Sequence, residues 1–206
     1  MLPLPIRSTL PGIAGLLAVA GACAVGIPPS TASTATAPDV AALAIPVTPA
    51  GSPHDFDFDF ELGRWHTALR RRPHPLSGSG IWADYAGTTT VRPVLDGRAN
   101  LVELDVSGPE GHLQGLALRL FEPKRQRWTL NFSNAASGTL AAPMTGGFGG
   151  GPRGVFYSAE EFDGRRVLVR FVIESTSVDT CRFEQAFSAD GGVTWETNWI
   201  AVDTRT

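Results

Sequence analysis

The feature that most constrains the fold of this chain is the regular spacing of turn sequences beyond residue 55. Between the turns lie runs rich in Val, Leu, Phe, Trp and Thr, and none of these runs carries a convincing helical stripe of apolar residues. This punctuation is typical of consecutive β-hairpins. The turn sequences are Asp96-Gly97, Gly108–Gly111, Glu122-Pro123, Asp163-Gly164 and Asp190–Gly192.

Several of the runs alternate as strands do, for example Trp128, Leu130 and Phe132 against the polar residues between them. A meander of so many strands has two edges, and closure into a barrel removes both. We therefore predict an all-β antiparallel meander closed as a barrel of about eight to ten strands, with a two-sheet β-sandwich as the alternative. Nine expected strands lie near residues 80–87, 88–95, 98–107, 112–121, 126–134, 152–160, 165–174, 180–188 and 194–203.

The N-terminal quarter of the chain is expected to lie outside this domain. Residues 1–27 have an early Arg7 and a short apolar run, which predicts a secretory signal peptide. Ala20-Gly21-Ala22-Cys23 resembles a lipoprotein box, so Cys23 is a lipidation candidate, with plain cleavage nearby as the alternative. Residues 28–54 are rich in Pro, Ser, Thr and Ala and predict a disordered tether, which leaves 55–206 as the barrel domain.

Charge and cysteine content narrow the classes of partner. The net charge of -3 gives no electrostatic reason to expect nucleic acid. The two cysteines lie on opposite sides of the tether, so no disulfide framework is expected, and Cys181 is interpreted as a buried thiol. We predict an exported protein, periplasmic, extracellular or anchored at the cell envelope, which reaches a membrane only through a lipid on Cys23.

A family resemblance enters at Phe58–Trp65. Gly63-Arg64-Trp65 resembles the Gly-x-Trp signature that opens the first strand of lipocalins and other calycins, and it is preceded here by Phe56-Asp57-Phe58. In that family the Trp closes the barrel and an Arg near the chain end packs on it, which implies this role for Trp65 and Arg205. Together with Leu95–Ala99, Leu118–Leu120 and Phe183–Ser188, the pattern looks like an uncharacterised family of secreted bacterial lipocalin-like proteins. The resemblance implies a lipocalin-like barrel and no established activity.

Other motifs predict structure more than chemistry. Ser188–Trp195 fits an Asp-box, a hairpin in which Asp190 bonds turn backbone and Trp195 packs beneath it. The acidic run His54–Glu61 matches no calcium loop, and the common zinc, nucleotide and serine-hydrolase signatures are absent from the sequence, so we predict no metal and no cofactor. The Gly-rich segment Gly146–Gly151 is expected to be a loop, either a mobile flap over a pocket or a plain connection.

Polar residues within apolar runs are the candidates for ligand contact. For any one of these residues an outward position is the simpler interpretation. If several of them face inward, their charges would have to pair, so that Glu103 or Glu184 would pair with Arg119 or Arg170. Such a group in a barrel mouth would suit the polar head of an apolar ligand. The candidate anchors are Glu103, Arg119, Asn131, Arg170, Glu184 and Asn198, and the candidate apolar walls are Trp82, Trp128 and Trp199.

Three functions are compatible with these features. The favoured hypothesis is a non-enzymatic binding module for a small apolar or amphiphilic molecule. The first alternative is a small-molecule enzyme that uses a buried carboxylate, with Glu184 as the weak candidate, which requires a Glu without a matched cation. The second alternative is a structural or protein-binding cell-surface module, which requires a filled barrel.

Overall fold

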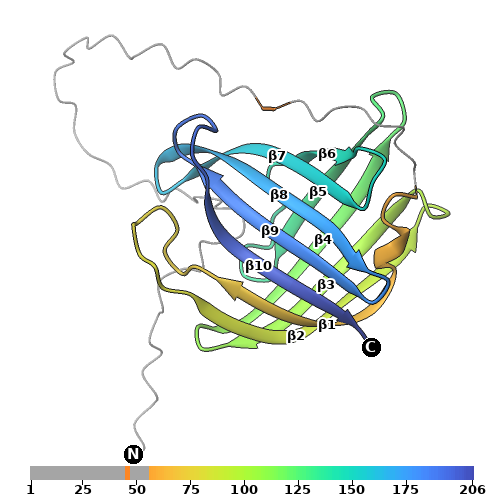
Figure 1. Ribbon diagram of the computed structural model, residues 1–206, viewed down its shortest axis with the longest axis horizontal. Helices are drawn as coiled ribbons and strands as arrows, with labels where there is room; N and C mark the ends of the chain where they lie inside the picture. Colours follow the sequence, from red (N-terminus) through yellow and green to blue (C-terminus); the bar gives the residue numbers. More distant parts are fainter. Residues whose placement is uncertain (1–44, 47–55) are drawn as a thin grey trace, which may run out of the picture.

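The computed structural model describes residues 45–46 and 56–206 (Figure 1). The expected signal peptide and Cys23 lie outside the described residues, as does all of the expected tether except residues 45–46. One 3-10 helix and ten strands follow in chain order: η1 (Asp59–Glu61), β1 (Gly63–Arg71), β2 (Ala83–Val94), β3 (Ala99–Gly108), β4 (Gly111–Glu122), β5 (Arg127–Asn134), β6 (Met144–Phe148), β7 (Arg153–Phe162), β8 (Arg165–Ser177), β9 (Thr180–Ser188) and β10 (Glu196–Arg205).

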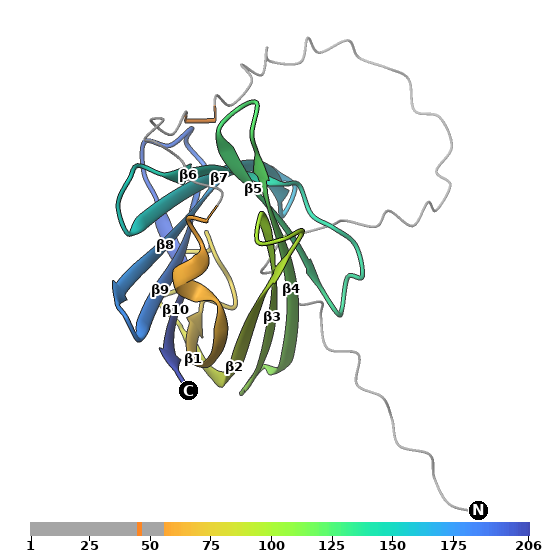
Figure 2. The same cartoon turned by 90° about the vertical axis from the view of Figure 1, so that its right-hand side faces the viewer.

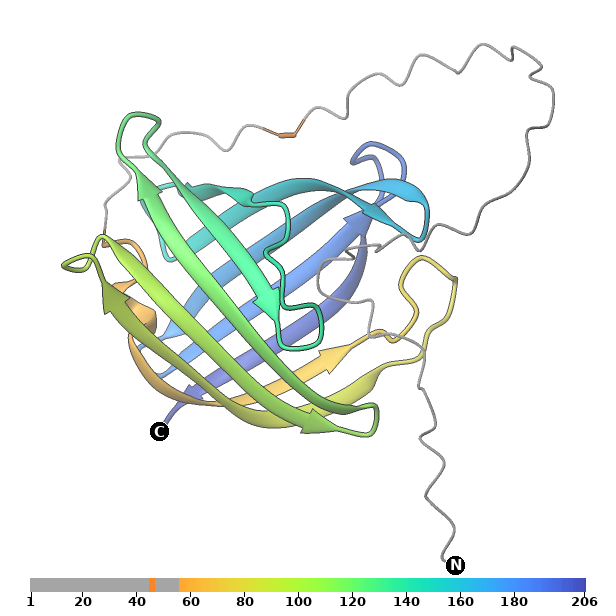
Figure 3. The same ribbon diagram turned by 180° about the vertical axis from the view of Figure 1, so that it is seen from behind.

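Each strand pairs antiparallel with the next one in the sequence, and β10 pairs with β1 to close the barrel. The closing register sets Trp65 opposite Arg205 and Arg71 opposite Trp199. Figure 3 shows the wall formed by β2 to β5, on the far side from β8, β9 and β10 in Figure 1. The predicted fold class, an antiparallel meander closed as a lipocalin-like barrel, is confirmed, and the alternative of a two-sheet sandwich is wrong.

Two expectations are wrong, a division into two strands within residues 80–95 and a loop that begins at Gly146, and close backbone packing explains both. The nine expected ranges also omit β1, which only the Gly-x-Trp resemblance indicated. Residues 80–95 were expected to form two strands but form β2 alone, and Gly87 lies within it. A Cβ at Gly87 would lie 2.0 Å from the carbonyl oxygen of Asp105 on β3, so this glycine permits close packing and makes no turn. The same holds for Gly146 in β6, where a Cβ would lie 2.0 Å from the carbonyl oxygen of Val155.

The Gly-rich segment is therefore only partly a loop. Gly146, Gly147 and Phe148 belong to β6 and pair with β7, which leaves Gly149–Gly151 in the turn between them. The Phe148 ring packs against Phe58 at 5.0 Å between centroids, so this turn lies at the same end of the barrel as η1. We call this the closed end.

Aromatic rings fill the closed end. Phe58 packs edge-on against Trp128 at 4.8 Å and lies 5.9 Å from Phe156, and all three side chains are buried. We call Phe58, Trp128, Phe148 and Phe156 the aromatic plug. Figure 2 shows η1, drawn in orange, between the β8–β10 side and the β3–β4 side of the barrel. Aromatic burial of this extent fixes the segment before β1 across the barrel end.

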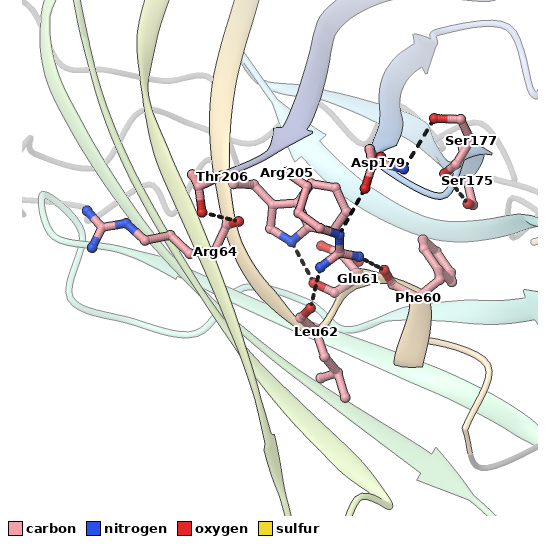
Figure 4. A network of polar contacts seen from close by, with 10 residues as sticks. Phe60, Glu61, Leu62, Arg64, Ser175, Ser177, Asp179, Arg205 and Thr206 are labelled. Atoms are coloured by element: carbon pink, nitrogen blue, oxygen red, sulfur yellow. Dashed lines mark hydrogen bonds and ion pairs between the residues drawn. The ribbon is translucent and has the colours of Figure 1, made fainter.

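Arg205 fastens the chain end to the same region (Figure 4). Its guanidinium carbon lies 4.1 Å from the centre of the Trp65 ring, and its two terminal nitrogens donate to the carbonyl oxygens of Leu62 and Phe60 at 3.0 and 2.9 Å. The Trp65 indole N–H donates to the carbonyl oxygen of Glu61 at 2.7 Å. The first and last strands are thus clamped together around the polypeptide that closes the barrel.

The Asp-box segment forms a hydrogen-bonded turn between β9 and β10. Asp190 accepts hydrogen bonds from Ser188 and Thr194, which hold the pKa of its carboxyl low, at about 2, and the Trp195 indole donates to the carbonyl oxygen of Gly192. The Arg170 guanidinium stacks on Trp195 at 4.6 Å. The motif therefore holds a loop in shape at the end opposite the closed end.

We expect Arg205→Ala to destabilise the barrel by roughly 2–3 kcal/mol, because it removes a cation–π contact and two charge-assisted hydrogen bonds. Urea unfolding measures the change. The control is Arg165→Ala, whose side chain is more than half exposed beside Asp163 and should cost less than about 0.5 kcal/mol. Equal losses in the two variants would show that Arg205 does not fasten the closed end.

Candidate functional site

The barrel encloses a cavity of about 110 Å³ that is partly open to solvent. It is lined by inward positions of several strands, because side chains along a strand alternate between the two faces of the sheet. On β10 these positions are Trp199, Ala201 and Asp203, and on β4 they are Gly115, Ala117 and Arg119. Further apolar walls come from Leu104, Leu130, Phe132, Phe171 and Phe183.

Six of the residues that line the cavity have polar side chains. These residues are Glu61, Thr67, Thr89, Arg119, Gln185 and Asp203, and we call them the polar layer. All six are buried. A mainly apolar cavity with a small group of convergent polar atoms has the composition of a small-molecule site.

The Glu61–Arg119 ion pair joins η1 to β4 within the polar layer. Both terminal nitrogens of Arg119 donate to the Glu61 carboxylate, one to each oxygen, and the second bond measures 3.0 Å. The Glu61 side chain is 0% exposed and that of Arg119 is 5% exposed. The guanidinium also lies 4.4 Å from the centre of the Phe58 ring in the aromatic plug. A two-pronged pair of this kind satisfies two charges that could not be buried singly.

Asp203 is a second buried carboxylate in the same layer. Its residue is 1% exposed, and its Oδ1 atom has no hydrogen-bond partner among the described residues. Burial raises the pKa of this carboxyl to about 7, helped by the negative charge of Glu61 and opposed by hydrogen bonds from Thr67 and Thr89 and by the charge of Arg119. The Thr67 and Thr89 hydroxyls are themselves 2.7 Å apart.

Two further atoms of the polar layer are buried without a partner in the described part of the chain. They are the Oε1 atom of Gln185 and the Nε atom of Arg119. Buried polar atoms in native proteins nearly always have a partner, so each of these is a candidate contact for a bound molecule or a water.

Cys181 lies near the polar layer, on β9. Its side chain is buried and free, and burial together with the charges of Glu61 and Asp203 raises the pKa of the thiol to about 12. The thiol is therefore uncharged at neutral pH, in agreement with its interpretation as a buried thiol, and it is a poor nucleophile.

Two of the candidate ligand contacts from the sequence, Arg119 and Trp199, line the cavity. Trp128 lies inside the barrel but belongs to the aromatic plug, where its indole N–H donates to Asp57 at 3.2 Å. Asn198 is buried at the irregular register of β10 and is not part of the cavity lining.

The other candidates face away from the cavity. Glu103 is more than half exposed beside Arg92, and Asn131 donates to the carbonyl oxygen of Leu118 on the neighbouring strand. Trp82 lies in the β1–β2 connection, where the guanidinium carbons of Arg70 and Arg72 lie 5.5 and 4.9 Å from its ring centre. Glu103 lies on the outer face because its neighbours Val102 and Leu104 take the inward positions of the same strand. The same holds for Asn131, between Leu130 and Phe132.

Arg170 and Glu184 also have partners outside the cavity. Arg170 stacks on Trp195, and Glu184 pairs with Arg182 at 2.8 Å and accepts from Thr197 at 3.3 Å. The expected pairing of Arg119 with Glu103 or Glu184 is wrong, since Glu61 takes that place. Glu184 has a matched cation, so it lacks the unpaired state that the catalytic hypothesis required of it.

Glu61 and Asp203 are the functional candidates that the sequence interpretation missed. Glu61 precedes Gly63 by two residues in a segment that was considered only as an acidic run without a calcium-loop pattern, although the Gly-x-Trp resemblance already placed that segment at the barrel end. Asp203 follows Trp199 by four residues on one strand, and the period of two sets it on the face of that Trp. The parity of β10 was a usable signal for Asp203.

Residues 45–46 and 56–206 contain neither a cluster of metal-ligating side chains nor a membrane-spanning helix. In that part of the chain, no three His, Cys, Asp or Glu side chains gather as a metal ion would require. The 3-10 turn η1 is the one helical element in that part of the chain. No helix there is long and apolar enough to cross a bilayer.

Comparison with known proteins finds barrels at low similarity. No family model and no curated protein matches the chain. A redesigned β-barrel, mFAP0, bound to DFHBI has a TM-score of 0.40 at 9% identity over 71% of this chain and 99% of its own. An S-type phycobiliprotein lyase, CPES from Guillardia theta, has a TM-score of 0.47 at 11% identity over 72% of this chain and 90% of its own. Similarity at this level carries no argument about ligand or activity.

We expect Glu61→Gln to destabilise the protein by about 3–5 kcal/mol, because it leaves the Arg119 guanidinium buried without a counter-charge. Glu184→Gln, which breaks a partly exposed pair with Arg182, should cost less than about 1 kcal/mol.

A double variant sharpens this comparison. Replacing Glu61 and Arg119 together by Met should recover most of the loss, since no buried charge then remains unpaired. Chemical denaturation of all four proteins provides the measurement, and a double variant as unstable as Glu61→Gln would contradict the assigned pairing.

Proposed function

We propose that this chain is a non-enzymatic binding module that holds a small, largely apolar molecule in its barrel, with the polar layer anchoring the head group of that molecule. The observation that carries the proposal is the cavity itself, with apolar walls and buried polar atoms that lack partners. An apolar cavity of about 150 Å³ takes up a benzene-sized molecule. A partly open cavity of about 110 Å³ suits a single ring or a short aliphatic chain.

The proposal extends to export and to family. The apolar run before Cys23 supports secretion, with lipidation of Cys23 as the anchored form of the same hypothesis. The motifs around Gly63-Arg64-Trp65 and Phe183–Ser188 support membership of the secreted bacterial lipocalin-like family. The ligand would then be a molecule met outside the cytoplasm.

One observation favours a second candidate function, an enzyme of the same cavity. The pKa of Asp203, raised to about 7, suits a carboxyl group that accepts and returns a proton near neutral pH. In this alternative Asp203 takes the place that the sequence assigned to Glu184. Chemical conversion of a bound molecule, lost in Asp203→Asn, would favour the enzyme over the binding module.

We expect the full-length protein to bind benzyl alcohol, and Ala117→Phe to weaken this binding at least roughly tenfold, because the added ring occupies the cavity. Leu116→Phe is the matched control, since it adds the same ring on the outer face of the same strand, where Leu116 is exposed. Chemical shifts of the interior strands and of the Trp199 indole N–H in ¹H–¹⁵N NMR report the titration. Equal binding by the two variants would place the ligand outside the barrel.

A further inference from the structure

The charges in the cavity are not balanced. Among the described residues that line it, the ionisable ones are Glu61, Arg119 and Asp203. Arg119 gives both of its terminal nitrogens to Glu61, which leaves Asp203 as a carboxyl group with no cation paired to it in the described part. The layer therefore holds two carboxyl groups for one guanidinium.

Two hydrogen-bond acceptors in the cavity lining have no donor, and one of them belongs to this excess carboxyl. Asp203 Oδ1 and Gln185 Oε1 both lack a hydrogen-bond donor among residues 56–206, and their residues are 1% and 4% exposed. A buried acceptor without a donor is destabilising, because it has lost its water and gained nothing in return. A molecule that brings an N–H group to Asp203 would remove that penalty there.

We propose that the ligand is a small apolar amine, whose ammonium group pairs with the Asp203 carboxylate while its apolar body lies against the aromatic walls of the cavity. This inference rests on the proposed binding function and names the chemical class of its ligand. The ammonium supplies the cation that the layer lacks and has several N–H groups that can donate to the carboxylate oxygens. The aromatic rings of Phe171, Phe183 and Trp199 in the lining suit a cation with an apolar body.

Other head groups fit the layer less well. A carboxylate would meet Glu61 and Asp203 while the Arg119 guanidinium is already paired, so an anion is disfavoured. An alcohol has a single O–H donor and carries no charge to offset that of Asp203. The expected order of affinity is therefore amine, then alcohol, then carboxylate.

The binding of an amine should depend on pH through Asp203. The groups that face it are Glu61 from η1, Arg119 from β4 and the neutral thiol of Cys181 from β9, while β1 and β2 contribute the hydroxyls of Thr67 and Thr89. Because an ammonium pairs with the ionised carboxylate, a proton on Asp203 competes with it. The affinity should therefore be full above the pKa of about 7 and fall about tenfold for each pH unit below it.

The test is calorimetric titration of the full-length protein with benzylamine, benzyl alcohol and benzoate, three molecules that share one ring. At pH 8 benzylamine should bind at least roughly tenfold more tightly than benzyl alcohol, and benzoate should bind most weakly. At pH 5.5 the affinity for benzylamine should be roughly thirtyfold lower than at pH 8, while that for benzyl alcohol should change less than about threefold.

Variants assign the effect to one carboxyl group. Asp203→Asn should lower the affinity for benzylamine to about that for benzyl alcohol and remove the pH dependence. Glu184→Gln, which alters a carboxylate on the outer face, should leave both unchanged. The comparison of the three ligands on the unaltered protein decides the matter even where Asp203→Asn does not fold.

The outcomes separate the two proposals. Binding of benzyl alcohol as tight as that of benzylamine, or tightest binding by benzoate, would overturn the amine inference while the binding function stands. Failure of all three molecules to bind would overturn both. An Asp203→Asn protein that keeps full affinity for benzylamine would show that the amine does not pair with Asp203.

Discussion

The ion pair between Glu61 and Arg119 joins the segment that closes the barrel to the wall that encloses the cavity. Glu61 lies at the end of η1, and its carboxylate reaches Arg119 on β4, so the short helix is held across the barrel from within. Outside the pair, the Arg205 guanidinium covers Trp65 and bonds the backbone of the same segment. The aromatic plug packs beneath it through Phe58, on which Arg119 lies. Each of these contacts depends on the position of η1.

The same pair determines what the cavity can recognise. A guanidinium in an apolar barrel would attract an anion if it were free, but this one is already neutralised by Glu61. The carboxyl of Asp203 is then the ionisable group of the layer that has no charged partner and that a ligand can satisfy. The structural device that closes the barrel thus reverses the charge preference that Arg119 alone would give. A filled barrel, which a purely structural module requires, is at odds with the cavity above this layer.

The sequence predicted the fold better than the site, for physical reasons. Turn sequences and period-two alternation are local signals, and they were enough for a closed antiparallel meander. Glycines within strands led to wrong strand boundaries in the prediction. Gly87 and Gly146 allow a neighbouring backbone to approach closely, and the sequence does not reveal this contact. The composition of the site depends on which alternate residues of each strand face inward. A shift of one residue along a strand would exchange inward Val102 for Glu103, or inward Gln185 for Glu184. The partner of Arg119 lies 58 residues away in the sequence, and no local pattern predicts such a contact.

The most direct test is a pH titration of the folded protein in which carboxyl-selective ¹³C NMR monitors the signal of the Asp203 carboxyl carbon. The Asp203→Asn variant assigns that signal. A carboxyl group that is buried beside Glu61 and has no cation of its own should titrate with a pKa near 7. Saturation with benzylamine should move this pKa downwards, because the ammonium stabilises the ionised form. A pKa near 4 in the free, folded protein would contradict the account, since it would mean that Asp203 is hydrated or already paired with a cation.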